Sequence, residues 1–458
     1  MVAAATACPM AFADPLESAL ISAYLNNPQI NAQRALVRAT DEGVSQALAG
    51  YRPRASATAS LGVQTVDTTI REIGSTTSPT APASYFSQAG GTFPHSFGAT
   101  ISQTLYNGFQ TSNRTRLAEA QVLSARETLR NTEQTVLVNA VTAYMNLLRD
   151  AAILELQRSN VEVLEEQLRQ ARTRLESGNV TATDVSQSES RLAVGRTQVF
   201  TAQANYLGSR AVYRQVIGVE PTKLFPASPV DRLFPANITA ANAIAVSNHP
   251  NVGAAQHNVD VALMQVKVAE GALYPTLTLQ ASAQKSYEQT LTTMRAMSAG
   301  VAGQLTVPIY QGGAEYSAIR QAKETQGQRQ LDLNAARDQV RAGFFQSWSL
   351  LDAAKSSIES TRAQVKAAEA ALNGVREEAR LGQRTTLDVL NAQQELVSAR
   401  IALVSAQRDR VVNSYAVLAS VGRLSPQVLG LAVPGYDASV HYQQIRDAWV
   451  GVRTPDGR

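Results

Sequence analysis

The chain has 458 residues, of which 44% are hydrophobic and only 6% are aromatic. So few large side chains favour thin interfaces over the thick cores of several ordinary globular domains. The formal net charge is +4, with both signs interleaved along the sequence, which argues against a nucleic-acid-binding surface.

Residues 1–13 have the character of a secretion signal. They are small and apolar and end in Ala11-Phe12-Ala13, a triplet typical of a signal-peptidase site. The usual basic start is absent, so we interpret residues 1–13 as a signal-peptide remnant. Cys8, the one cysteine, falls within it; a lipid anchor on Cys8 is the alternative, although the preceding residues match poorly. A mature chain without cysteine suits an oxidising compartment.

The same landmarks occur twice in the same order, which indicates an internal duplication. Pro28 precedes Pro250 by 222 residues, whereas Gly178 precedes Gly382 by 204. The first copy therefore carries 222 − 204 = 18 extra residues, which fall in residues 70–94. This stretch is rich in Ser, Thr, Gly and Pro, so we expect a long loop at an exposed tip.

Each copy is expected to contain a helix, a β-hairpin and a long α-hairpin. The predicted divisions are repeat 1 at residues 14–222, with its β-hairpin at 53–106 and α-hairpin at 110–217; an equatorial linker at 223–237; repeat 2 at 238–431, with its β-hairpin at 275–310 and α-hairpin at 314–421; and an equatorial or flexible C-terminal tail at 432–458.

The predicted strands alternate apolar and polar residues. In the second copy Leu277, Leu279 and Ala281 share one face of the strand, and the threonine and glutamine residues between them share the other. Segments of about ten residues with one apolar face are typical of transmembrane β-strands. A sheet in a soluble protein is the alternative, but an isolated hairpin is marginal in water. Since four strands cannot close a barrel in lipid, we predict that three copies share a 12-stranded wall.

Two long helical runs follow the hairpins. Residues 110–176 and 314–381 contain no proline, and at about 1.5 Å per residue each would span roughly 100 Å. The chain is predicted to reverse at Gly178 and Gly382, because glycine accepts the positive φ needed there. Apolar residues, mostly leucines, recur at spacings of three, four and seven, which predicts antiparallel coiled coils.

This order of elements, present twice, resembles the TolC family of outer-membrane channels. The local sequences VPIYQGG at 307–313 and GQRTTLDVL at 382–390 agree with it, and the resemblance covers nearly all of residues 14–431. It implies an α+β membrane protein: a trimeric 12-stranded barrel, with four strands per chain, continuing into a long periplasmic α-helical barrel. The expected location is the outer membrane of a Gram-negative bacterium, with a large periplasmic extension.

The resemblance also implies a function. The chain would form an exit duct that passively conducts substrates from type I secretion or tripartite efflux machinery. The implied partners are a periplasmic adaptor, an inner-membrane ABC transporter or proton-driven pump, and outer-membrane lipid. A periplasmic coiled-coil adaptor is the alternative, although it would not explain two hairpins with apolar faces.

No enzymatic activity and no cofactor are expected. The sequence contains no nucleotide-binding loop, and its four histidines do not fall at metal-ligand spacing with carboxylates.

The resemblance assigns a gate to the two reversals. Asp388 matches an inward-pointing aspartate ring at the periplasmic aperture, and three copies would make the mouth cation-selective. Where the family has a second aspartate one turn later, this chain has Asn391. Asp184 and Arg384 match a pair that latches the closed state, and a tyrosine that assists this pair is replaced by Ala379.

Helix capping is a competing explanation of both aspartates. Thr181 with Asp184, and Thr385 with Asp388, each fit a capping box with threonine as the N-cap. Capping does not account for Arg384, because a cation before a helix N-terminus is disfavoured by the helix dipole.

Overall fold

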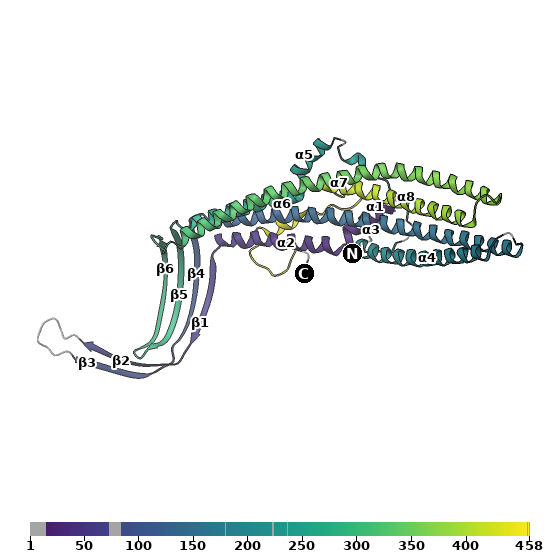
Figure 1. Ribbon diagram of the computed structural model, residues 1–458. Coiled ribbons are helices and arrows are strands. Elements are labelled where there is room, and N and C mark those ends of the chain that lie inside the picture. Colours follow the sequence, from purple (N-terminus) through teal and green to yellow (C-terminus); the bar gives the residue numbers. More distant parts are fainter. Residues whose placement is uncertain are drawn as a thin grey trace, which may run out of the picture. The chain divides into compact units, whose positions relative to one another are not determined.

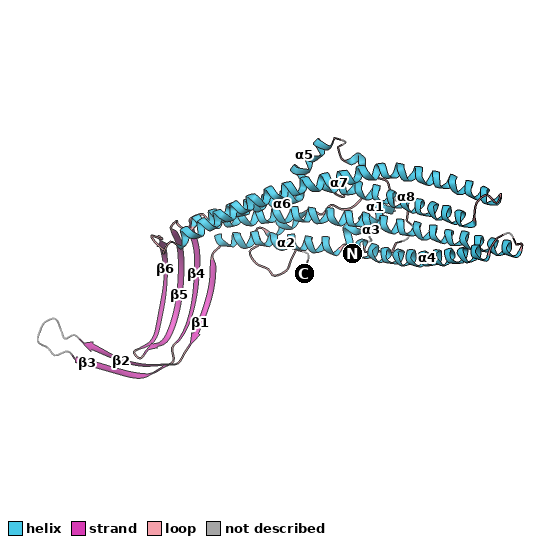
Figure 2. Cartoon of the chain, viewed as in Figure 1, coloured by secondary structure: helices cyan, strands magenta, loops and turns pink. Residues whose placement is uncertain are grey.

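The computed structural model describes residues 15–72, 84–178, 180–221, 224–235, 237–455 and 457. Helices make up most of this part of the chain (Figure 2). The signal-like residues 1–13, with Cys8, lie outside the described residues.

The chain divides into two compact units. Unit 1 comprises Met1–Ala39, Val122–His257 and Gln330–His441, and unit 2 comprises Thr40–Gln121, Asn258–Arg329 and Tyr442–Arg458. Both units combine segments from the two predicted repeats.

The helices are mostly long. They are α1 (Pro15–Asn26), α2 (Pro28–Leu48), α3 (Gln110–Glu176), α4 (Ala182–Ile217), α5 (Ile238–Asn248), α6 (Pro250–Gly271), α7 (Ala314–Arg380), α8 (Thr386–Ser420) and α9 (Ala438–Ile445). Helices α3 and α7 each have 67 residues, about 100 Å at 1.5 Å per residue. Within the described residues, none of the helices has both the length and the apolar character needed to span a membrane.

Unit 2 contains a four-stranded antiparallel sheet in the order β1-β4-β5-β6. The strands are β1 (Arg54–Leu61), β4 (His95–Asn107), β5 (Thr276–Thr290) and β6 (Thr293–Thr306). Figure 1 shows β4 between β1 and β5, so the first hairpin is joined to the second along β4 and β5. Strands β1 and β6 are therefore the edges of this sheet.

The register gives the sheet one apolar and one polar face, since residues paired across strands project to the same side. One apolar row is Ala55, Ile101, Ala281 and Val301, and the adjacent row on the opposite face is Ser56, Thr100, Ser282 and Gly300. In the single chain Ile101 is 51% exposed and Val301 is 73% exposed. The apolar face is thus uncovered.

The expected loop over residues 70–94 is wrong at residues 70–72 and 84–92, which form strands. Strands β2 (Gln64–Glu72) and β3 (Ser84–Thr92) pair as a separate two-stranded antiparallel sheet, while residues 73–83 lie outside the described part. Backbone pairing, such as Thr68 with Gln88, holds this ribbon together. It has no apolar face like that of the larger sheet, so no apolar alternation marked it in the sequence.

The last predicted strand is also shorter than expected. Strand β6 ends at Thr306, although the alternation was predicted to continue to Tyr310. Pro308 explains the early end, because proline has no N–H to donate to a strand ladder.

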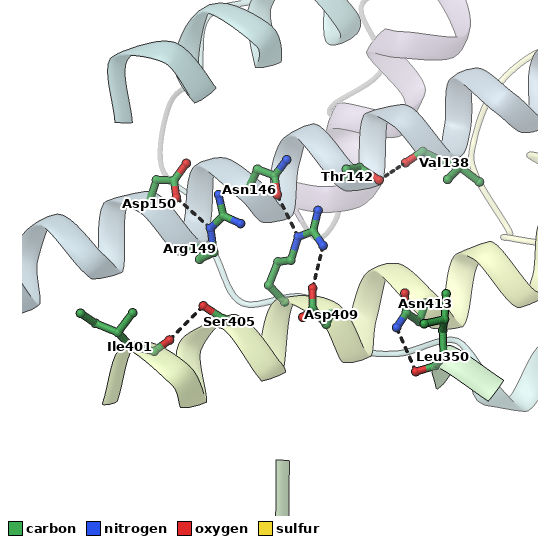
Figure 3. Close-up of polar contacts among 11 residues, drawn as sticks. Val138, Thr142, Asn146, Arg149, Asp150, Leu350, Ile401, Ser405, Asp409 and Asn413 are labelled. Atoms are coloured by element: carbon green, nitrogen blue, oxygen red, sulfur yellow. Dashed lines mark hydrogen bonds and ion pairs between the residues drawn. The ribbon is translucent and has the colours of Figure 1, made fainter. Parts of the chain in front are cut away.

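The core of unit 1 is built mostly from aliphatic side chains on long helices, and Tyr144 and Phe344 are also fully buried. Leu137 and Leu147 of α3 and Val417 and Leu418 of α8 are completely buried. Figure 3 shows Asn146 on α3 and Asp409 on α8. Arg408 donates from Nε to Asn146 Oδ1 at 2.8 Å and from Nη1 to Asp409 Oδ1 at 2.7 Å.

The described part of the predicted equatorial linker, residues 224–235, packs against the helices of unit 1. The Tyr144 hydroxyl donates to the Phe225 carbonyl at 2.9 Å and accepts from its N–H at 3.0 Å. Arg410 of α8 pairs with Asp231. Phe225 is therefore tied to α3, and Asp231 to α8.

Candidate gate at the helix reversals

Both long helices end at a glycine with positive φ. Gly178 follows α3 with φ 75°, and Gly382 follows α7 with φ 77°, a conformation that side-chain-bearing residues rarely adopt. At the second reversal the N–H of Gln383 donates to the Glu378 carbonyl at 2.9 Å, which satisfies a carbonyl at the end of the helix.

Both return helices begin with a complete capping box. The Asp388 carboxylate accepts from the Thr385 N–H at 3.0 Å and from its hydroxyl at 2.9 Å, and the Asp388 N–H donates to Thr385 Oγ1 at 3.2 Å. Asp184 and Thr181 repeat this arrangement at 2.9, 2.8 and 3.3 Å. The two reversals thus share one local design.

These hydrogen bonds set the charge of both aspartates. The Thr385 backbone N–H and then its hydroxyl lower the pKa of Asp388, with a smaller contribution from the charge of Arg384. The backbone and side chain of Thr181 likewise lower the pKa of Asp184. Both carboxyls are therefore ionised at neutral pH, which is what a charged aperture needs.

Arg384 is paired within its own reversal. Its Nε donates to Glu378 Oε2 at 2.8 Å, and both side chains remain about half exposed. Among the described residues of one chain, no ion pair joins Arg384 to Asp184. The structure brings Asp388 to Thr385 and Asp184 to Thr181, but it leaves the two halves of the predicted latch apart.

A contact between the two α-hairpins was missed by the sequence reasoning. Arg191 of α4 donates from Nη2 to Asn391 Oδ1 at 2.8 Å, although the residues are 200 positions apart. The family resemblance accounts for Asn391 only as the loss of an acid. One feature of the sequence could have indicated this contact: Arg191 lies seven residues after Asp184, so both side chains project from the same side of the helix.

A second set of contacts joins the hairpins beside this pair. Gln393 of α8 donates to Asn160 Oδ1 at 3.3 Å and accepts from Arg376 at 3.0 Å. Four buried leucines pack next to it: Leu164, Leu168, Leu192 and Leu390. The first turns of α8 are therefore held against α3 and α4 by both polar and apolar contacts.

Within the described part of the chain, no group of three or more His, Cys, Asp or Glu side chains is arranged to hold a metal ion. The chemistry that the reversals offer is a pair of ionised caps, one exposed arginine and a network linking two helical hairpins.

Comparison with known families agrees with this architecture. Residues 20–219 and 243–423 match the family model described as outer membrane efflux protein. The chain is similar to the outer membrane efflux protein BepC of Brucella suis biovar 1, with 40% identity over 449 residues, 98% of this chain and 94% of that protein.

A more distant similarity links the chain to a secretion protein. It is 29% identical over 320 residues to the alkaline protease secretion protein AprF of Pseudomonas aeruginosa, covering 68% of this chain and 66% of that protein. The fold matches the solved structure of the Campylobacter jejuni CmeC outer membrane channel with a TM-score of 0.75, over 94% of this chain and 89% of that one. The identity there is 15%, so this likeness shows the fold alone.

Proposed function

This chain belongs to the outer membrane efflux protein family, the family of TolC, and from that premise we propose that three copies form a gated exit duct. It is an outer-membrane export protein of a Gram-negative bacterium, and its family consists of channel proteins rather than enzymes. The α+β fold agrees with that of solved channels of the family.

The sheet carries the proposal of a shared wall. Within the described residues β1 pairs only with β4, and β6 pairs only with β5. Open strand edges are not tolerated in hydrocarbon, and one face of this sheet is mainly apolar. Three sheets of four strands joined edge to edge would satisfy both edges in a 12-stranded barrel.

We further propose that the chain arose by duplication. The matched landmarks of the two halves support this, and so does the recurrence of strand pair, 67-residue helix, glycine and capped return helix. Three copies of two α-hairpins would then supply the wall of a helical tube on the periplasmic side.

Purification and conductance measurements test the duct. The protein should require detergent, migrate as a trimer, and give stepwise conductance in planar lipid bilayers. A water-soluble monomer that gives no conductance would support the adaptor alternative and overturn the duct.

The reversals are proposed as the gate of this duct. In a trimer, three Asp388 carboxylates around one axis would form a periplasmic aperture ring that enriches cations. Asp184 and Arg384 would act as the closed-state latch only between neighbouring copies, because within one chain Arg384 is bound to Glu378. Thr181 and Thr385 fix the caps, and Gly178 and Gly382 form the turns.

Replacing Arg384 by serine should raise single-channel conductance, because the closed tip loses a contact in each of three copies. The matched control is Glu378→Gln, which removes only the partner that Arg384 has within its own chain. An ion pair between exposed side chains contributes little to stability, so a modest increase in conductance is expected. Equal effects of both variants would show that the contact within the reversal, and not a latch between copies, restrains the tip.

The partners are proposed from the family. An export duct without an energy source needs an inner-membrane ABC transporter or proton-driven pump, reached through a periplasmic adaptor. BepC is named for efflux and AprF for protease secretion, so small molecules and secreted proteins are both proposed cargo classes. A strain that lacks this protein would separate the two classes. Increased accumulation of a fluorescent efflux substrate would indicate small-molecule cargo, and loss of protease secretion would indicate protein cargo.

A further inference from the structure

The last described residues of the chain are tied to the start of the sheet. Within unit 2, Ser45 of α2 donates to the Ile445 carbonyl at 3.1 Å, and Arg52 donates from Nη1 to the Ala448 carbonyl at 2.7 Å. The Arg52 guanidinium also lies over the Trp449 ring, 4.8 Å from its centroid. Trp449 is thus held beside Arg52, two residues before β1 begins at Arg54.

The tied segment displays its apolar side chains to the outside. Trp449 is 67% exposed, Val450 94% and Val452 fully exposed, and the neighbouring Tyr51 is 49% exposed. Apolar groups gathered at one place on a surface, rather than scattered singly, indicate a binding surface.

Three arginines lie close to these apolar groups in the sequence. Arg54, Arg446 and Arg453 are exposed, and among the described residues no ion pair involves any of the three. Asp447 is the one acid in residues 445–453. Exposed arginines beside tryptophan and valine complement a partner that is anionic at its surface and apolar beneath it.

The position of the surface selects that partner, and here the inference rests on the proposed function. If the sheet spans the outer membrane, the start of β1 lies at the periplasmic edge of the bilayer. Other aromatic side chains lie near the same ends of the strands: Tyr106 and Phe109 are in edge-to-face contact, and Tyr310 is 78% exposed. Tryptophan and tyrosine favour the headgroup level, where the ring meets both hydrocarbon and water.

We propose that Tyr51, Arg54 and residues 445–453 form a surface that binds anionic phospholipid headgroups of the periplasmic leaflet. Trp449 and the two valines enter the boundary between headgroups and acyl chains, while the arginines contact phosphate. Arg52 does not serve as a lipid ligand; it orients Trp449 through the ring contact and the Ala448 hydrogen bond. The surface would anchor each copy to the membrane next to its strands.

Tryptophan fluorescence tests this surface in the full-length trimer. The chain has two tryptophans, and Trp348 packs with its ring centroid 5.7 Å from that of Phe344 and 5.9 Å from that of Phe234. Trp348→Phe therefore leaves Trp449 as the single reporter. In vesicles of phosphatidylethanolamine and phosphatidylglycerol, bromine on the phosphatidylglycerol chains should quench Trp449 emission.

The charge requirement has a matched control. Arg446→Gln and Arg453→Gln should each shift the equilibrium between the lipid-bound and the free segment by about fivefold. This is the factor by which one basic residue near an anionic membrane surface strengthens binding. The pair Arg158→Gln and Arg174→Gln removes the same charge from exposed positions of α3 and should leave the quenching unchanged.

Two results would overturn the lipid surface. Quenching by aqueous iodide without quenching by the brominated lipid would place Trp449 in water, and protection from both quenchers would place it under protein. Conductance of the same preparation separates this failure from that of the duct. Normal conductance with Trp449 unquenched by lipid rejects the lipid surface alone, whereas a soluble, non-conducting protein rejects both proposals.

Discussion

Ile101→Arg is expected to prevent the chain from forming stable trimers in the outer membrane. Ile101 lies at the middle of β4, in the apolar row that it shares with Ala55, Ala281 and Val301. Arginine on the lipid face at the bilayer midplane costs about 2–4 kcal/mol, and the assembled barrel would carry it three times. Heat-modifiable trimer bands in outer-membrane fractions, together with conductance of the purified protein, measure the loss.

The neighbouring residue provides the control. Thr100 belongs to the adjacent row on the polar face of the same strand, so Thr100→Arg should retain trimers and alter only conductance or selectivity. If both variants assembled equally well, the apolar face would not meet lipid. The proposal of a membrane wall would then lose the observation that carries it.

Asp388→Asn is expected to reduce the preference of the open channel for cations. The substitution removes one negative charge per copy while keeping an oxygen that can accept from Thr385, so the helix cap is largely retained. Reversal potentials in a salt gradient measure the change. Asp184→Asn is the comparison variant: its capping box has the same geometry, and because Asp184 is assigned to the latch and not to the ring, the change should leave the cation preference of the open channel unaltered.

The same ring predicts a pH dependence with a defined sign. Hydrogen bonds lower the pKa of Asp388 below the ordinary 3.8, so its charge, and with it cation preference, should persist as pH falls to that value. The stabilising effect of the cap is likewise complete above 3.8 and is lost at lower pH. Repulsion between three carboxylates acts in the opposite direction, so a midpoint above 3.8 would report how closely the copies approach.

The sequence predicted the strands that have one apolar and one polar face. Alternation identified the face that carries Ile101 and Val301 because each residue step reverses the side of a strand. The ribbon of β2 and β3 lacks that contrast, so its threonines and glycines were read as a loop. Backbone hydrogen bonds between the two strands stabilise it, and these bonds do not require particular side chains.

The reversals were predictable in their local chemistry and not in their longer contacts. Thr385 and Asp388 are three residues apart, so the spacing alone indicates a capping box. The Arg384–Glu378 pair depends on how the turn folds back, and the Arg191–Asn391 bond depends on how two distant hairpins pack. Neither geometry is encoded in a periodic pattern of one helix.

The pairing of β4 with β5 constrains the order in which the molecule can assemble. Phe97 is paired with Lys285 across 285 − 97 = 188 residues, whereas each capping box closes over three. Contacts between near neighbours form quickly, and distant ones must first overcome the entropy of closing a long loop. Newly exported chains can therefore complete their helical hairpins while the strands are still apart. The pairing of β4 with β5 would come last. The apolar face of the sheet would then form as one surface only when a bilayer and other copies of the chain are present to cover it.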